Sequence, residues 1–426
     1  MTRRVVVTGL GVIAPNGIGL ADFEAALRAG RSGIRHIEAM REFGFVCQVA
    51  GVPPLPEAVI AAHFTDIERR ALNSNHLYAS LAALEAWSDA GLSRPAADDE
   101  TVDWDTGAVI GTGIGGMDTI VERLVDQVRA GKVRRLGTTL VEQIMASGVS
   151  ARVAGLLGLG NQVTTNSSAC TTGTEAVLES FRAIRDGRTQ RMVAGASEGT
   201  SIYTWAGFDS MRVLMRRSNE EPERASRPLS ASAGGFVPAA GAGALVLEEL
   251  DSARTRGARI YGEVLGGAAN CGGQRMGGSM TSPNPTGMQR CIRAALAAAG
   301  IAPEQIDVIN GHLTATSADP NELQVWSAAL EIPPDRFPLV TATKSMIGHA
   351  LGAAGAVECV AAMLMLSRGF VHPCCNCEDL HPGVAAFAAA IPQETRAVPE
   401  MKILAKAGFG FGDVNAALIL RRWEDC

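Results

Sequence analysis

The stretch VTTNSSACTTGTEA (163–176) has the pattern of a strand, a tight turn and the start of a helix that ends at RDG (185–187). The same order of patterns recurs later in the chain, where VTATKSMIGHALGAAG (340–355) opens a helix that ends at SRG (367–369). A pattern that occurs twice at this length predicts a chain built from two similar halves.

The repeat extends on both sides of these stretches. A strand in RMVAGASEG (191–199) is expected after the first helix, and a strand in GFVHPCCNCE (369–378) after the second. Upstream, each half has a helix, a short strand and a polar loop. In the first half they are expected at 78–91, 105–110 and 111–116. In the second half they are expected at 291–300, 306–310 and 311–316. Such alternation predicts parallel strands joined by crossover helices. We expect an α/β protein with halves at 1–255 and 256–426, and functional groups at the carboxyl ends of strands.

The composition excludes several classes of protein. The chain has 426 residues and a net charge of -6, so no overall positive field is available to hold nucleic acid. No run approaches about 18 apolar residues, so we expect no membrane span, and RRVVVTGLGVIAPNG (3–17) is interpreted as a strand and turn. The nine cysteines are scattered and odd in number, which does not indicate disulfides. We expect a cytoplasmic enzyme.

Cys170 lies where the first repeat turns from strand to helix. A single cysteine is more often a small buried apolar residue than a nucleophile. Here, however, unpaired backbone N–H groups and the positive end of the helix dipole favour the thiolate and can bind an oxyanion. The setting makes Cys170 the candidate nucleophile.

His312 and His349, two of only seven histidines, lie in the strand-end loops that the repeat directs toward Cys170. One histidine alone is more often structural, but two that converge on one cysteine indicate catalysis. Lys344 precedes His349, and Glu358 follows it in the apolar segment AVECVAAMLML (356–366). A buried carboxylate needs a partner, so we expect Lys344 to pair with Glu358.

The segment KAGFGFGDVNAALIL (406–420) places glycines around Phe409 and Phe411, just before a buried strand. Such a loop can approach a site closely and move. A plain glycine-rich turn is the alternative, but two aromatic side chains exposed there without a function would be unusual.

Two other motifs carry less weight. GTGIGG (111–116) fits the glycine pattern of dinucleotide-binding loops, yet no acidic residue follows about 20 residues later, where the sequence is basic (129–135). A second cluster suggests metal ligands by its content: His372, Cys374, Cys375, Cys377 and His381. Adjacent cysteines in a strand point to opposite faces, and no second ligand pair has finger-like spacing. We expect neither a nucleotide nor a metal.

Together the motifs resemble those of the β-ketoacyl-acyl carrier protein synthases of the I/II type, along essentially the whole chain. The motifs are RRVVVTGLGVIAPNG, GTGIGG, SACTTG (168–173), NGHLTAT (310–316), TKSMIGHALGAAG (343–355) and GFGFGDVN (408–415). The resemblance implies the thiolase fold, a five-layered αβαβα sandwich of two pseudo-symmetric halves. It also implies an acyltransferase that elongates a fatty acyl or related polyketide or polyene chain.

The resemblance implies a catalytic role for five residues by their positions in these motifs. Cys170 matches the nucleophile that takes an acyl group from a carrier-protein thioester. His312 and His349 match the pair that assists the loss of carbon dioxide from the malonyl thioester, whose enolate then attacks the acyl-cysteine. Lys344 and Glu358 match the motif lysine and its carboxylate partner.

Further residues match positions that bind substrate. Phe411 matches the gating phenylalanine, with Phe409 beside it, and its backbone N–H completes the oxyanion hole with that of Cys170. The expected substrate-binding residues are Thr314 and Thr316 for pantetheine, and Ile114 with Gly113 for the acyl pocket near a dimer interface.

The resemblance also implies partners. The substrates are acyl and malonyl thioesters carried on the phosphopantetheine of an acyl carrier protein, so no other cofactor is expected. Arginines in segments comparable to the family's carrier-binding surface are Arg69, Arg70, Arg212 and Arg217. A local basic patch is compatible with an acidic chain. A homodimer is expected, with a heterodimer of two ketosynthase subunits as the alternative.

The chain departs from the family at three places. Leu313 stands where glycine is usual, which predicts a different or strained backbone. SRPLSASAGG (226–235) lacks the usual Asp and Arg, and Asp413 with Val414 replaces a Gly-Thr pair. The branch is therefore divergent, and the preferred acyl chain and the pathway stay open.

Two alternative functions remain at this point. A chain-length-factor-like subunit of a ketosynthase heterodimer would lack the active cysteine, and Cys170 argues against that reading. A thiolase-like acyl-CoA enzyme would carry a second cysteine in its C-terminal glycine-rich loop, whereas GFGFGDVN has none.

Overall fold

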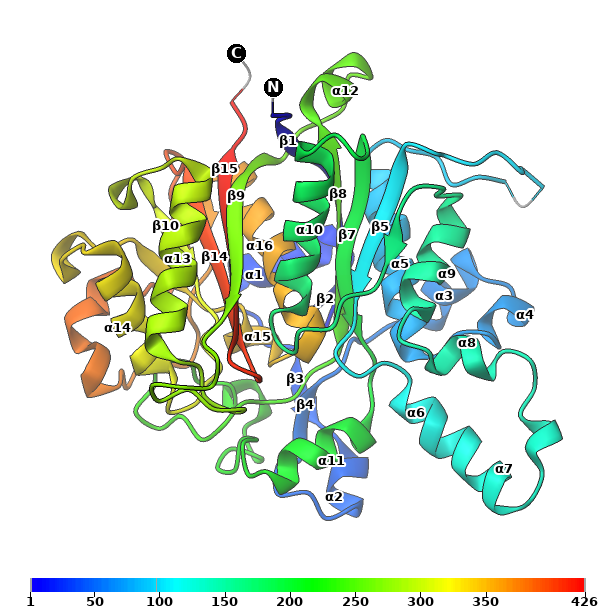
Figure 1. The fold of residues 1–426 in the computed structure, drawn as a ribbon. Coiled ribbons are helices and arrows are strands. Elements are labelled where there is room, and N and C mark those ends of the chain that lie inside the picture. The colour runs from blue at the N-terminus through cyan, green and yellow to red at the C-terminus, as the bar shows by residue number, and fades with distance from the viewer. Residues whose placement is uncertain (1, 97, 425–426) are drawn as a thin grey trace.

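The structure is a computed structural model that describes residues 2–96 and 98–424. Its main elements form five layers, in the order helices, sheet, helices, sheet, helices (Figure 1). The two sheet halves are continuous, because β1 (Val5–Ala14) pairs with β9 (Gly262–Cys271) at the centre. The predicted thiolase fold is confirmed.

The first sheet half has the strand order β1, β8, β7, β5, β6. The bounds are β8 Gly241–Glu249, β7 Arg191–Glu198, β5 Thr106–Gly111 and β6 Val163–Thr164. β5 is parallel to β6 and β7, whereas β8 is antiparallel to β7 and β1. Every residue of β1 is buried, as expected for a strand that helices cover on both faces.

The second sheet half repeats this order as β9, β15, β14, β10, β11. The bounds are β15 Val414–Arg422, β14 Ile403–Gly410, β10 Val308–Asn310 and β11 Leu339–Thr341. β14 is parallel to β10 and antiparallel to β15. In the same way, β7 is parallel to β5 and antiparallel to β8. β14 is therefore the counterpart of β7.

The strand predicted within 369–378 forms only at its start and does not join the central sheet. β12 covers only Phe370–Val371 and pairs with β13 (Arg396–Ala397), outside the central sheet. Pro373 has no backbone N–H to continue a ladder, and the chain then turns at residues 375–376. The strand before Cys170 is also shorter than predicted, since residues 165–169 lie outside β6.

Three pairs of helices form the helical layers. They are α5 (Ser74–Asp89) with α9 (Gly148–Leu157) outside the first half, α10 (Thr172–Arg185) with α16 (Ala354–Arg368) in the middle, and α13 (Pro285–Ala299) with α14 (Asp319–Leu330) outside the second (Figure 1). A Cβ at Gly173 would lie 2.3 Å from the backbone N of Ala356. Glycine therefore lets α10 and α16 cross in backbone contact.

The segment Leu351–Arg368, which contains α16, is long and apolar enough to cross a membrane by length and composition alone. It is 89% buried inside the protein. Its side chains pack against both sheet halves and α10. The apolar character of this segment is therefore explained by its place in the middle layer.

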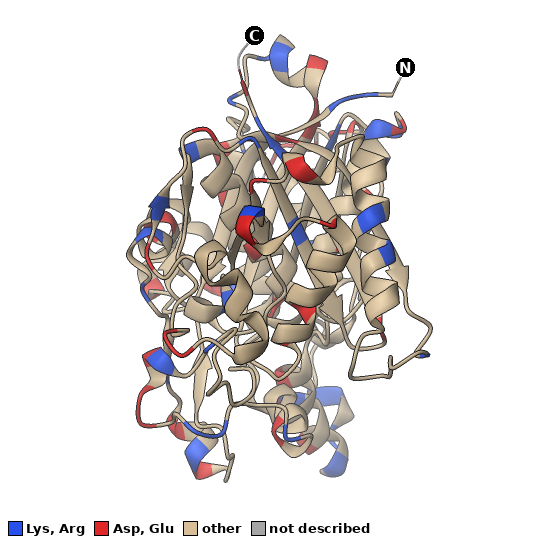
Figure 2. Cartoon of the chain, turned by 90° about the vertical axis from the view of Figure 1, so that its left-hand side faces the viewer, with Lys and Arg blue, Asp and Glu red and all other residues tan. Residues whose placement is uncertain are grey.

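Short elements surround the layers. They are β2 (Gly17–Ile18), α1 (Leu20–Ala29), β3 (Ile34–His36), α2 (Glu38–Glu42), β4 (Val49–Gly51), α3 (Glu57–His63), α4 (Asp66–Arg69), α6 (Met117–Thr119), α7 (Asp126–Arg129), α8 (Leu140–Ile144), α11 (Ile202–Ser210), α12 (Leu250–Thr255) and α15 (Lys344–Ile347). Figure 2 shows acidic and basic segments interspersed over one side of the molecule. The charge of this side is therefore mixed.

Candidate active site

A cavity of about 680 Å³ lies at the carboxyl ends of the parallel strands. Gly113 and Ile114, which follow β5, line it together with His312, which follows β10. Phe411 lines it directly after β14, and Cys170 lines it two residues before α10. The repeat therefore brings side chains from both halves to one cavity.

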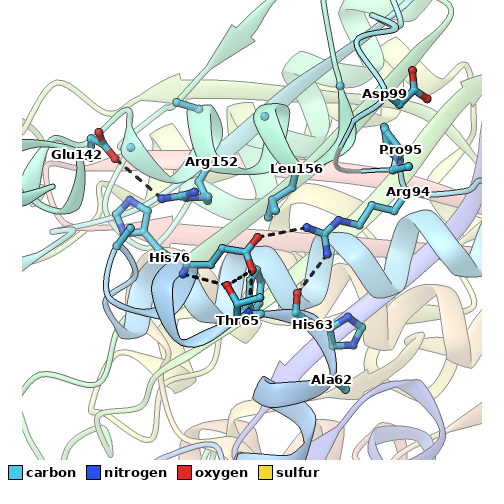
Figure 3. Close-up of a pocket in the computed structure, with 18 of the residues that line it drawn as sticks. Ala62, His63, Thr65, His76, Arg94, Pro95, Asp99, Glu142, Arg152 and Leu156 are labelled. Carbon is cyan, nitrogen blue, oxygen red and sulfur yellow. Dashed lines mark hydrogen bonds and ion pairs between the residues drawn. The ribbon is translucent and has the colours of Figure 1, made fainter.

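A larger cavity of about 1120 Å³ lies beside α3, α8 and α9, away from these strand ends (Figure 3). Its arginines are already matched by acids, with Arg94 3.9 Å from Glu68 and Arg152 3.9 Å from Glu142. Burial lowers the pKa of His76 in its wall to about 4, so this ring is neutral. No cysteine is among the described residues that line it, so the smaller cavity is the candidate active site.

Cys170 is held by an irregular turn between β6 and α10. Ala169, which precedes it, has a φ of 49°, and the Thr171 hydroxyl donates to the carbonyl of Ser168 at 2.7 Å. Burial raises the pKa of Cys170 to about 11, although Lys344 and the backbone N–H of Phe411 oppose this rise. Burial therefore outweighs the groups that favour the thiolate, and the thiol is the expected form at neutral pH.

His349 is the direct partner of Cys170, with Nε2 3.2 Å from Sγ. The backbone N–H of Leu351 donates to Nδ1 at 3.1 Å, so the hydrogen of the neutral ring lies on Nε2. The backbone of His349 is fixed by the 237–239 segment, where it donates to the carbonyl of Val237 and accepts from Ala239. The ring therefore presents an N–H donor to the cavity.

His312 faces His349, with ring centroids 5.4 Å apart and an angle of 84° between the planes. Lys344 Nζ lies 3.5 Å from Nδ1 of His312 and donates to its carbonyl at 2.7 Å. An ammonium can only donate, so Nδ1 accepts and the hydrogen of this ring is also on Nε2. One ligand atom each from Cys170, His312 and His349 lies within 4.8 Å of the others.

The protonation of both imidazoles follows from their surroundings. Burial, and after it the charge of Lys344, holds the pKa of His312 and of His349 well below its usual range. Both rings are therefore neutral at neutral pH. The cavity holds two neutral N–H donors beside a thiol.

Lys344 and Glu358 form the predicted ion pair, and both side chains are 1% exposed. A second lysine, Lys406 on β14, is 0% exposed and pairs with the other carboxylate oxygen of Glu358. One carboxylate thus serves two buried ammonium groups. Burial lowers the pKa of Lys344, and Glu358 opposes this shift.

Phe411 and Phe409 both line the cavity. The backbone N–H of Phe411 donates to Sγ of Cys170, and a Cβ at Gly410 would lie 3.1 Å from the backbone N of Cys170. Glycine at 410 therefore leaves space in front of that N–H group. The Phe411 ring packs against Phe208, which also lines the cavity.

The predicted substrate-binding residues all line this cavity. Thr314 and Thr316 have hydroxyl oxygens 3.0 Å apart, and the carboxylate of Asp319 accepts from the backbone N–H groups of residues 314–316. On the opposite wall, buried Glu198 accepts from the N–H groups of Gly113 at 2.9 Å and Ile114 at 3.2 Å. Acidic side chains therefore hold the backbone of both the 314–316 and the 113–114 segments of the cavity lining.

The four predicted arginines lie in two places. Arg212 and Arg217 are exposed, and Arg212 directly precedes Val213, which lines the cavity. Arg69 on α4 pairs with Glu57, and exposed Arg70 follows it. Figure 1 shows α4 well apart from α11, which precedes Arg212. Within a single chain, the four predicted arginines therefore do not form one surface patch.

The departures from the family pattern have structural counterparts. Leu313 has a φ of 24°, a strained value for a branched side chain, and it is fully buried in the apolar cluster of the second half. Asp413 has a φ of 63° and accepts from the backbone N–H groups of Asn284 at 2.7 Å and Gln274 at 2.8 Å. Asp413 therefore ties the 274–284 loop to the Phe411 loop.

Sequence reasoning missed the buried groups that support the site: Lys406, Glu198, Asp319 and Glu322. Glu322 accepts from the backbone N–H groups of His312 at 2.7 Å and Leu313 at 2.8 Å, and burial raises its pKa to about 7. The signal for Lys406 was a charge inside the apolar strand ILAKAGF (403–409), the same signal that identified Glu358.

Comparison with known proteins identifies the family of this chain. The model of the beta-ketoacyl synthase N-terminal domain matches residues 2–253, and that of the C-terminal domain matches residues 261–378. The 3-oxoacyl-[acyl-carrier-protein] synthase 1 of Haemophilus influenzae is 35% identical over 99% of this chain and 100% of its own length.

Solved structures give the same result. A ketosynthase described in complex with its type II PKS acyl carrier protein superposes with a TM-score of 0.88 and 29% identity, over 99% of this chain and 100% of the other. The ishigamide ketosynthase/chain length factor has a TM-score of 0.88 and 31% identity, over 100% of both chains. This chain belongs to the β-ketoacyl synthase family.

Proposed function

We propose that this chain is a β-ketoacyl-acyl carrier protein synthase that joins a malonyl unit to an acyl group held on Cys170. The observation that carries the proposal is the 3.2 Å contact between Cys170 Sγ and Nε2 of His349, in a cavity that also holds His312. A thiol and two neutral N–H donors are the groups that acyl transfer and decarboxylation require.

In the first half-reaction the sulfur of Cys170 attacks the carbonyl carbon of an acyl thioester. Its proton passes to the leaving pantetheine thiolate, and the carbon–sulfur bond to pantetheine breaks. The developing oxyanion accepts hydrogen bonds from the backbone N–H groups of Cys170 and Phe411. The acyl group is then bound to the enzyme as a thioester.

In the second half-reaction a malonyl thioester enters the cavity. Nε2–H of His312 and of His349 donate to its thioester carbonyl, so that the electrons of the breaking bond to carbon dioxide form a stabilised enolate. The enolate carbon attacks the acyl-cysteine, and the Cys170 thiolate leaves. Two imidazole donors suffice for this chemistry, so we propose that no metal or cofactor is needed beyond the carrier's phosphopantetheine.

Lys344 and Glu358 are positioning residues in this proposal. Lys344 fixes the tautomer of His312 through Nδ1, and Glu358 forms ion pairs with both Lys344 and Lys406. Glu322 holds the backbone at His312. Thr314 and Thr316 are proposed to bind pantetheine, and Gly113 and Ile114 to line the acyl pocket.

The acyl carrier protein is the proposed macromolecular partner. Its docking site would include Arg212 and Arg217 beside the cavity mouth, with Arg69 and Arg70 on a separate part of the surface. We propose a homodimer in the cytoplasm, without a membrane span, with halves that meet near residue 255. The family-model boundary between residues 253 and 261 supports this division.

A second candidate is a subunit of a ketosynthase heterodimer. The likeness to the ishigamide ketosynthase/chain length factor supports it. A subunit without catalytic activity would not need His349 within hydrogen-bond distance of Cys170, so we favour the catalytic reading.

The test separates the half-reactions. Replacing His312 or His349 with Ala should abolish malonyl decarboxylation, while transfer of an acyl group to Cys170 stays measurable by mass spectrometry. Equal loss of both half-reactions would contradict the proposed division of roles. Carrier proteins loaded with acyl chains of graded length and unsaturation then identify the preferred substrate.

A further inference from the structure

Lys406 is a buried lysine to which the proposed mechanism assigns no step. It lies in the middle of β14, where it is 0% exposed, and it pairs in register with Asn310 of β10. His312 follows Asn310 by two residues, and Phe409 follows Lys406 by three. Both His312 and Phe409 line the active-site cavity. Lys406 therefore lies in the sheet directly before two of the segments that form the cavity.

The ammonium of Lys406 shares its counter-ion with a second lysine. Nζ of Lys406 lies 2.5 Å from Oε2 of Glu358 and donates to the carbonyl of Ala407, also at 2.5 Å. The other carboxylate oxygen of Glu358 pairs with Lys344. All three charged side chains are at most 1% exposed. This buried charge group (Lys344, Glu358 and Lys406) therefore carries one positive charge in excess.

The surrounding titratable groups offset this excess only in part. Burial lowers the pKa of His372 to about 4 and raises that of Cys359 to about 12, so both are neutral at neutral pH. Glu322 is a further acid that acts on Lys344, but burial raises its pKa to about 7. Glu322 thus carries only part of a negative charge at neutral pH. The buried charge group keeps a positive excess.

Such an excess is costly for the fold. A buried ammonium without a full counter-charge lowers stability, because its hydration is lost without equal compensation. An apolar side chain would fill the position without this cost, as Leu404 does on the same face of β14 two residues earlier. A side chain that weakens the fold beside a catalytic cavity is expected where its charge serves the site.

The charge acts on both catalytic imidazoles. Lys344 is in contact with His312, with Nζ 3.5 Å from Nδ1. Burial is the largest cause of the low pKa of His312 and of His349, the charge of Lys344 follows, and the charge of Lys406 acts in the same direction. A positive charge behind a neutral ring also polarises it and strengthens its N–H donor. Lys406 therefore favours two neutral, strong donors.

We propose that Lys406 is a positioning residue whose charge, acting through His312 and His349, promotes decarboxylation of the malonyl thioester. The inference rests on the proposed function. As the bond to carbon dioxide breaks, its electron pair passes to the thioester oxygen, which becomes negative in front of the two rings. The excess positive charge stabilises this oxyanion. Acyl transfer depends less on Lys406, because the backbone N–H groups of Cys170 and Phe411 hold the oxyanion of that step.

The test replaces Lys406 with Met, which is similar in length and uncharged, in the full chain. Lys402→Met is the matched control, because Lys402 is exposed and lies four residues earlier. Lys406→Met should lower kcat for decarboxylation of malonyl-carrier protein at least about tenfold, with KM within about threefold. Acylation of Cys170, weighed by mass spectrometry, should fall less than about threefold. Lys402→Met should stay within about twofold of wild type in both assays.

The pH profile separates the charge from a packing role. Loss of a positive charge raises the pKa of His312 and His349, so the rings become protonated at a higher pH. An imidazolium stabilises the malonyl carboxylate that has to leave, which slows decarboxylation. The acid limb of the rate profile should therefore move to higher pH by at least about half a unit in Lys406→Met. A packing defect would lower the rate at every pH without moving this limb.

Stability gives the second check. Lys406→Met leaves Lys344 and Glu358 as a matched pair, so its midpoint of urea unfolding should equal or exceed that of wild type. If the Met variant does not fold, Lys406→Gln, which keeps a donor for the carbonyl of Ala407, is measured with the same expectations.

Three results would overturn the role of Lys406. They are a folded, uncharged variant with the kcat of wild type, an equal loss of both half-reactions, and a lower unfolding midpoint together with an unmoved acid limb. Absence of decarboxylation in wild type and in Lys402→Met would instead contradict the proposed function.

Discussion

The reactivity of Cys170 is set by its surroundings more than by its place before a helix. Burial raises the pKa of this thiol to about 11, and its partner His349 is a neutral N–H donor rather than a cation. The thiol therefore deprotonates as it reacts, instead of being stored as a thiolate. Reaction with a small alkylating agent reports this state directly.

Alkylation of Cys170 by iodoacetamide should accelerate about tenfold per pH unit between about pH 7 and 9, because the raised pKa keeps the thiolate a small fraction that grows with pH. Peptide mapping assigns the rate to Cys170, and Cys170→Ser gives the background from other thiols. A rate that levels off below about pH 8 would show a thiolate already formed and contradict this account.

The carboxylate of Glu358 forms ion pairs with two ammonium groups in the core. Glu358→Gln would leave Lys344 and Lys406 buried without a counter-charge, which typically costs about 3–5 kcal/mol. We expect this loss in the free energy of unfolding from urea titration. Exposed Glu304→Gln is the matched control, with a change within about 0.5 kcal/mol. Equal stability of the two variants would show that the pair network contributes little.

Single site residues could be predicted from the sequence where they belong to a motif. Cys170, His312 and His349, which the motifs singled out, line one cavity, and Lys344 and Glu358 form the expected ion pair. The groups that it did not supply, such as Glu198 and Glu322, accept hydrogen bonds from backbone N–H groups of loops outside their own helix or strand. No local pattern identifies such a partner, because the contact exists only once the chain is folded.

At the scale of elements, the site depends on how closely α10 and α16 approach. Gly173 faces the backbone of Ala356, and a Cβ at Gly355 would lie 2.6 Å from the backbone N of Thr174. Helices in such contact cannot separate without moving Cys170, which precedes α10, or His349, which precedes α16. Small residues here are therefore a packing requirement.

Gly173→Ala should lower the free energy of unfolding by about 1–3 kcal/mol, the usual cost of overpacking, because backbone atoms cannot move aside. The control is Gly155→Ala in α9, where a Cβ meets nothing within 4 Å. That change should raise stability by about 0.5–1 kcal/mol through helix propensity. Thermal or urea unfolding measures both, and a stabilised Gly173→Ala would contradict the close crossing.

Elements were predictable where hydrophobic periodicity was strong and uninterrupted. The helices at α5, α10, α13 and α16 were expected, whereas the strand expected within 369–378 covers only Phe370–Val371. There, apolar Cys374 and Cys377 are buried in a turn rather than along a strand. A buried turn and a buried strand can have the same apolar residues in the sequence. Only the folded structure shows which of the two forms.

At the scale of the whole molecule, the two halves create the site by meeting. Cys170 comes from the first half, and His312, His349 and Phe411 from the second, all at the carboxyl ends of equivalent strands. The repeat in the sequence predicted this arrangement. It could not predict which surface faces a carrier protein, because surface arginines lack a periodic pattern.

Arg217→Glu should weaken binding of the acyl carrier protein more than Arg69→Glu, because Arg217 is exposed in the segment beside the cavity, whereas Arg69 is already paired with Glu57. Charge reversal at an exposed site acts through screened electrostatics, so the difference should shrink as salt is raised. Affinity measured by fluorescence anisotropy at two ionic strengths checks this. A larger effect at Arg69 would place the docking surface near α4.

We propose that Cys170 carries an acyl group, which a decarboxylated malonyl unit attacks. The most direct measurement incubates the protein with an acyl carrier protein loaded with an acyl chain, weighs the Cys170 peptide, and then adds malonyl-carrier protein. We expect an acyl adduct on Cys170 that disappears as a 3-oxoacyl product two carbons longer is released. Absence of the adduct, or loss of carbon dioxide from malonyl-carrier protein without any carbon–carbon product, would contradict it.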